Sequence, residues 1–234
     1  KNGHKDVVQM LLDHSNSSID LNARNNSGST AFLLACYNGH KDVVKLLLDH
    51  SGIEYNARNV LGQTAFMTMA CDNGNKEVVK LLLEHSNKIE LNLRDDFGFT
   101  AFMVACYHGH KDVVQLFLDQ PDGNIDLNAR DDDGETALMF ACHFGHKDVV
   151  KLLLDHSERI EMNARDNDGW TAFMYACCHG REVVKLLLEH SDIDISGYED
   201  LPQEIRYFIE LHLETSKELK RFNEIHQTKR RKLS

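Results

Sequence analysis

The sequence predicts an all-α repeat solenoid: stacked helix-turn-helix units, joined by β-hairpin loops and closed by a C-terminal helical cap. The first observation is that three short blocks recur in a constant order along most of the chain. The second is their spacing, because the threonine of the first block returns every 34 to 36 residues, at Thr30, Thr64, Thr100, Thr136 and Thr171. Units this short cannot bury their own apolar faces, so they must stack on one another.

The first block predicts a short helix with a defined start. It runs from Gly28 to Cys36 as Gly-x-Thr-Ala followed by Ala-Cys, and similar segments begin at Gly62, Gly98, Gly134 and Gly169. The glycine permits a tight turn, and the threonine hydroxyl can cap the unpaired amides of the first helical turn. The small Ala-Cys pair lets neighbouring helices approach closely.

The second and third blocks predict a second helix and a loop. Gly39-His40 ends the first helix, and Val43, Val44 and Leu46 to Leu48 then recur at the spacing of a wide apolar helix face. The stretch Asp20-Leu-Asn-Ala-Arg24 alternates like a short strand and runs into an Asn-rich and Gly-containing turn. The sequence therefore predicts a hairpin after every helix pair.

In this order the three blocks resemble the ankyrin-repeat family over roughly residues 1–196. The family's usual Thr-Pro-Leu-His is replaced by Thr-Ala-Phe or Thr-Ala-Leu, so we expect Phe and Met packing to offset the lost proline and histidine. The resemblance predicts a partial repeat at 1–24, consisting of a second helix and a hairpin. It predicts full repeats at 25–58, 59–94, 95–130, 131–165 and 166–196.

The two ends depart from the repeat pattern. The chain opens inside a repeat at Lys1, which indicates a truncated array with an exposed apolar end. Residues 197–226 carry an apolar stripe and predict a helical cap, and residues 227–234 predict a disordered basic tail. The cluster Lys229-Arg-Arg-Lys232 is a weak nuclear-import signal. Leu201-Pro-Gln-Glu-Ile205 resembles the start of an F-box, which suggests an alternative role as substrate-recognition part of a ubiquitin-ligase adaptor.

Composition argues against several functions. The formal net charge of −11 disfavours a nucleic-acid partner, and no apolar run is long enough to span a membrane. The cysteines that recur once per repeat are too far apart for disulfides, which predicts buried thiols and an intracellular location, cytoplasmic or nuclear. The Cys–His spacings repeat with the units, and the acidic run from Asp131 to Glu135 lacks a calcium-loop pattern. We therefore expect no catalytic residue, cofactor or metal.

Positions that vary between repeats are the candidates for binding. Ankyrin proteins bind through hairpin tips and the exposed end of the first helix, and the resemblance transfers these roles to this chain. The helix-end candidates are Tyr37, Asp72, Tyr107, His108, His143, Phe144 and His179. The tip candidates are Asp96, Phe97, Phe99, Asp132, Asp133, Glu135, Asp168 and Trp170.

These residues predict a non-catalytic scaffold for another protein. The aromatic residues are candidate binding hot spots, and the acidic residues around them favour a partner segment that carries basic and apolar residues. We expect a monomer, apart from contacts at the exposed N-terminal half repeat. A purely structural spacer is a further alternative, in which the surface aromatic residues would be dispensable.

Overall fold

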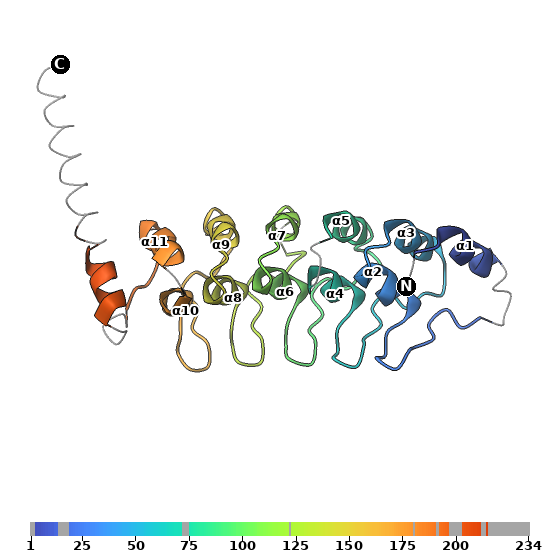
Figure 1. The fold of residues 1–234 in the computed structure, drawn as a ribbon, viewed down its shortest axis with the longest axis horizontal. Helices are drawn as coiled ribbons and strands as arrows, with labels where there is room; N and C mark the ends of the chain where they lie inside the picture. The colour runs from blue at the N-terminus through green and yellow to red at the C-terminus, as the bar shows by residue number, and fades with distance from the viewer. Residues whose placement is uncertain are drawn as a thin grey trace, which may run out of the picture.

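The helices form two parallel rows, with the loops projecting from one side of the array (Figure 1). The computed structural model describes residues 3–13, 19–71, 75–121, 123–179, 181–190, 192–196, 203–211 and 214. The first helices of the repeats make up one row: α2 (Ala31–Tyr37), α4 (Ala65–Cys71), α6 (Ala101–Tyr107), α8 (Ala137–His143) and α10 (Ala172–His179). The second helices make up the other: α1 (Lys5–Asp13), α3 (Lys41–Asp49), α5 (Lys76–Glu84), α7 (Lys111–Leu118), α9 (Lys147–Leu154) and α11 (Arg181–Glu189).

The threonine of each repeat caps the first helix, as the sequence predicts. In α8 the Thr136 hydroxyl oxygen accepts a hydrogen bond from the Met139 N–H (3.4 Å), and α2 begins with the same bond from Leu33 to Thr30 (3.2 Å). The Met139 sulfur in turn accepts from the Thr136 N–H (3.3 Å). Methionine thus occupies the place that Glu or Gln takes in a capping box, which satisfies a second amide at the helix start.

Small buried residues hold the first helices close together. Ala105, Cys106, Ala141 and Cys142 are fully buried where α6 packs against α8. The thiols of Cys106 and Cys142 form no disulfide. Burial raises the pKa of both thiols, because a thiolate would lose its hydration there. These cysteines therefore act as small core residues, whereas Cys178 is exposed.

The loops turn back as hairpins, yet none of the described residues forms a strand. Each tip is closed by its own side chain: Asp95 Oδ1 accepts hydrogen bonds from the Phe97 and Phe99 amides, both at 3.0 Å. One backbone bond then reaches the next tip, from the Asp132 N–H to the Phe97 carbonyl (3.3 Å). A single bond per repeat builds no ladder, so the strand-like alternation in the sequence yields turns instead.

The repeated Leu-Asn-Ala-Arg block ties successive repeats together. The Asn128 side chain donates to the Arg159 carbonyl (2.9 Å) and accepts from the Glu161 amide (2.8 Å), and Asn22, Asn56, Asn92 and Asn163 make equivalent bonds. Arg130 likewise donates to the Arg165 carbonyl (2.6 Å) in the next repeat. The guanidinium groups of Arg24 and Arg58 make the same contact with the carbonyls of Arg58 and Arg94, so the arginines of the block join neighbouring loops.

The two ends of the array differ in how their apolar residues are covered. No helix precedes α1 among the described residues, and Val7 is 52% exposed whereas the equivalent Val43 in α3 is 6% exposed. At the other end, residues 203–211 form a further helix (Figure 1). Its Ile209 is buried in the common core. The F-box-like start at Leu201-Pro202 and the basic tail lie outside the described residues.

Candidate functional site

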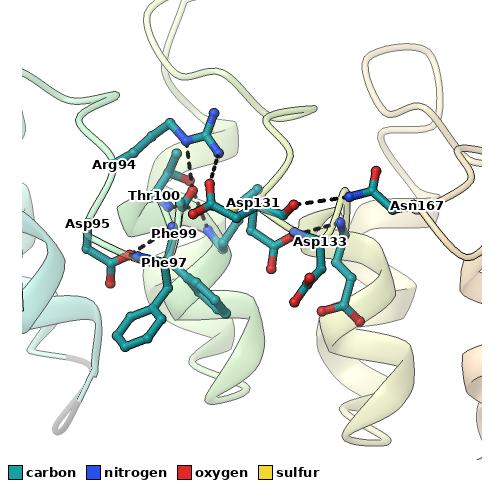
Figure 2. Close-up of polar contacts among 12 residues, drawn as sticks. Arg94, Asp95, Phe97, Phe99, Thr100, Asp131, Asp133 and Asn167 are labelled. Carbon is teal, nitrogen blue, oxygen red and sulfur yellow. Dashed lines mark hydrogen bonds and ion pairs between the residues drawn. The ribbon is translucent and has the colours of Figure 1, made fainter.

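A groove of about 350 Å³ opens between two neighbouring hairpin tips and the ends of α6 and α8. Figure 2 shows how the first tip contributes Phe97 and Phe99 while the second contributes Asp131 and Asp133. The full lining consists of aromatic residues, carboxylates and one histidine: Phe97, Phe99, Tyr107, Phe140, Phe144, Asp131, Asp132, Asp133, Glu135 and His143. We call it the aromatic–acidic groove.

The aromatic side of the groove is a set of mutually packed rings. Phe99 stacks on Phe140 with ring centroids 4.8 Å apart, and Tyr107 lies 4.3 Å from Phe144. Phe99 and Tyr107 are therefore half buried, whereas Phe97 at the tip is 60% exposed. Contacts of this kind rigidify the wall, and the exposed ring faces are left to meet a ligand.

The four carboxylates have different environments. The Asp132 carboxylate pairs with Arg94 (3.2 Å), and Asp131 Oδ1 accepts the amides of Asp133 (3.1 Å) and Glu135 (2.7 Å). Within the described part of the chain, no lysine or arginine forms an ion pair with Asp133 or Glu135. The groove therefore carries negative charge that no lysine or arginine in the described part of the chain compensates.

Asp131 closes its loop at an electrostatic cost. Burial raises the pKa of its carboxyl, although the two backbone hydrogen bonds partly oppose the shift. Asn25 and Asn59 occupy the same place in other repeats and accept equivalent amide bonds through their side-chain oxygens. The geometry of this tip therefore requires a side-chain oxygen and does not require a charge.

Asp131→Asn is expected to raise the melting temperature at pH 7 by about 1–3 °C, or less than about 1 kcal/mol in a chain of this size. The destabilisation by the charge is complete above the raised pKa of Asp131 and declines as the pH falls from there to the ordinary aspartate pKa, so the gain should vanish below the ordinary aspartate range. Thermal unfolding of both proteins at several pH values measures this difference. A gain that persists in acid would show that the charge is not its cause.

The three carboxylates of Asp131, Asp133 and Glu135 place oxygens within 4.8 Å of one another. Such spacing could accommodate a cation, but Asp131 Oδ1 already binds two amides and the asparagine tips adopt the same turn. The turn itself accounts for the position of Asp131, so the cluster by itself does not define a metal site.

A second aromatic group adjoins the groove. Trp170 is exposed at the next tip, and its ring lies 5.3 Å from that of Tyr175, which is 5.2 Å from His143 in the groove lining. The Tyr175 hydroxyl donates to Asp166 Oδ2 (2.7 Å). Burial and the nearby carboxylates of Asp166 and Glu135 raise the pKa of the Tyr175 phenol, so it is a hydrogen-bond donor and not an anion.

The remaining predicted residues are spread along the array. Tyr37 is exposed at the end of α2 and Asp96 and Asp168 are exposed at tips, but none of the three lines the groove. His108 packs beside Tyr107, with ring centroids 4.9 Å apart, and does not line the groove either. Asp72 and the side chain of His179 lie outside the described residues.

Sequence reasoning missed Phe140 and Tyr175. Both occupy the residue directly before the Ala-Cys pair, and that position varies between repeats, with Leu34 and Val104 in two others. The tip residues were chosen because they differ between repeats while the adjacent positions stay the same. The same criterion, applied within the first helix, would have identified Phe140 and Tyr175. The criterion was restricted to loops and helix ends, where side chains are most often free of packing.

The comparisons with known proteins agree with this architecture. The sequence matches the family model for ankyrin repeats in three copies, over residues 1–59, 54–131 and 123–197. A search among curated proteins found no match. In the part of the chain that the structure describes, no helix has the length and apolar character needed to cross a membrane. Ankyrin repeats generally mediate protein–protein interaction. Since the matches cover most of its length, the chain belongs to the ankyrin-repeat family.

Proposed function

We propose that this chain is a non-catalytic scaffold that binds a partner protein through the aromatic–acidic groove and the adjoining tip at Trp170. The observation that carries the proposal is the exposure of large aromatic side chains that the repeat does not need. Phe97 and Trp170 occupy tip positions filled by Ser27 and Ser29 in another repeat with the same turn, so loop closure does not require them. Exposed aromatic residues around a groove are typical of binding hot spots.

The acidic tips favour a partner segment that is basic as well as apolar. Asp133 and Glu135 face the groove, and Asp168 is exposed on the neighbouring tip. Charge of one sign around an apolar groove accelerates the encounter with an oppositely charged segment and penalises acidic competitors. The partner interface would therefore combine apolar contact at the rings with basic residues at the rim.

The test is a pull-down from a lysate of the source cells with the wild-type chain and a variant that carries Phe97→Ser, Phe144→Ser and Trp170→Ser. These three side chains are exposed, whereas Phe99 and Tyr107 pack against Phe140 and their loss would disturb the fold. The matched control carries Val60→Ser and Leu61→Ser, which removes exposed apolar residues from a different tip. Circular dichroism establishes that all three proteins are folded.

A partner retained by wild type and control but lost by the aromatic variant supports the proposal. Equal recovery by all three proteins contradicts the groove as the binding site and makes residues 197–234 the next segment to test for binding. Recovery of a ubiquitin-ligase subunit that depends on residues 200–226 would favour the adaptor role, which stays a prediction from the sequence.

A further inference from the structure

We propose that the aromatic–acidic groove holds the side chain of a single arginine from the partner segment. This inference rests on the proposed function, since it specifies which partner residue occupies the same groove. Its basis is the combination of an aromatic wall with two carboxylates, Asp133 and Glu135, that lack a cation within the described residues. An arginine would fill an apolar space and supply the missing positive charge at the same time.

The aromatic wall suits a planar cation. Phe99, Tyr107 and Phe144 belong to one packed cluster, with Tyr107 6.2 Å from Phe99 and 4.3 Å from Phe144. A guanidinium group stacks on an aromatic face, and its propyl stem covers apolar surface. The exposed ring of Phe97 lies at the rim, where it can cover such a stem (Figure 2).

The opposite wall supplies hydrogen-bond acceptors. One oxygen each from Asp131, Asp133 and Glu135 lies within 4.8 Å of the others, so several acceptors converge on one place. The Asp132 carboxylate is a poorer acceptor for a guanidinium group, because Arg94 already binds it. The Tyr175 hydroxyl donates to Asp166, and the Asp131 oxygen is held by amides, so Asp133 and Glu135 are the acceptors with capacity left.

Converging acceptors distinguish arginine from other cations. Guanidinium offers several N–H donors in a fixed plane and can bind two carboxylates while one face rests on a ring. Lysine concentrates its donors at a single strongly hydrated point and stacks less well. Trimethyllysine has no N–H donor, so it would use the rings and leave the carboxylates without hydrogen bonds.

The experiment is a titration of the purified whole chain with the peptide acetyl-Ala-Ala-Arg-Ala-Ala-amide, followed by amide chemical shifts in NMR. Three further peptides replace arginine with lysine, trimethyllysine or citrulline, the last being a neutral analogue of the same shape. We expect saturable shifts at residues 97–99 and 131–135 with the arginine peptide, and affinity at least about tenfold weaker with citrulline because the charge-assisted bonds are lost. Added salt should weaken the arginine complex.

Two double variants test whether the carboxylates of the groove are the ones that bind the arginine peptide. Asp133→Asn with Glu135→Gln is expected to weaken the arginine peptide about tenfold or more, since neutral oxygens form weaker bonds to a guanidinium. Asp148→Asn with Glu158→Gln removes the same net charge from exposed positions on α9 and the loop after it, and should leave the affinity unchanged. The NMR spectrum of each variant reports whether the fold is intact.

Several outcomes would overturn the inference. These are equal binding of the citrulline peptide, equal or tighter binding of either lysine peptide, shifts confined to other surfaces, and no saturable shift at the highest soluble concentration. The pull-down separates this failure from failure of the proposed function. If the aromatic variant loses its partner but the arginine peptide does not bind, the groove binds a protein and arginine is not its anchor.

Discussion

Leu153→Ala is expected to destabilise the chain by about 2–5 kcal/mol, because it empties a fully buried site between stacked helices. Leu153 lies on the inner face of α9, where it is completely covered, and the stacked helices on either side restrict the collapse of the resulting cavity. Urea denaturation followed by circular dichroism, with extrapolation of the unfolding free energy to water, measures the loss.

The repeat supplies a matched control at Leu11. It holds the equivalent position in α1 but is 50% exposed, since none of the described residues before α1 forms a helix that could cover that face. Leu11→Ala should therefore cost about 1 kcal/mol or less, in proportion to the smaller area removed from water. Similar losses at both positions would mean that the two faces are equally covered in solution, contrary to this structure.

Gly109→Ala is expected to destabilise the chain by more than the same change at Gly145. Both glycines end a first helix in the left-handed region, with φ of +72° and +69°, which by itself costs an alanine about 1–2 kcal/mol. At Gly109 the new Cβ would also lie 2.5 Å from Nδ1 of His146 in the next repeat. That imidazole is held by a bond between its Nε2 and the Tyr107 carbonyl (2.7 Å).

We expect the clash to add about 1–3 kcal/mol at Gly109, the usual cost of crowding a packed site. At Gly145 no described atom comes within 4 Å of the corresponding Cβ, because the following repeat has Arg181 directly after its glycine and lacks the histidine. The difference in urea midpoint between the two variants isolates the contact with His146. Equal midpoints would indicate that the imidazole moves aside freely.

The structure agrees best with the sequence predictions for features that depend on residues within a single repeat. The threonine caps and the apolar faces depend on residues within a few positions of one another, so the recurring blocks predicted them directly. Recurrence also predicted that the cysteines pack in the core, since one residue type at one repeated position must occupy one repeated environment.

Bonds between repeats could not be predicted in the same way. The asparagine of the Leu-Asn-Ala-Arg block looked like part of a short strand, yet its side chain bonds backbone groups 29 to 34 residues further on, as Asn128 does to Arg159 and Glu161. The recurrence showed that this residue matters, but the partner groups are backbone atoms that every residue carries. Only the stacking of one loop on the next identifies them.

The sequence by itself determined the family, the succession of helices and the set of variable surface positions. Only the tertiary structure decided which of those positions form a site. Phe97 and Phe99 are two residues apart in one tip, yet one is exposed and the other stacks on Phe140 of the following repeat. Their difference depends on which side chain the neighbouring repeat presents, a contact between residues about forty positions apart that no local pattern encodes.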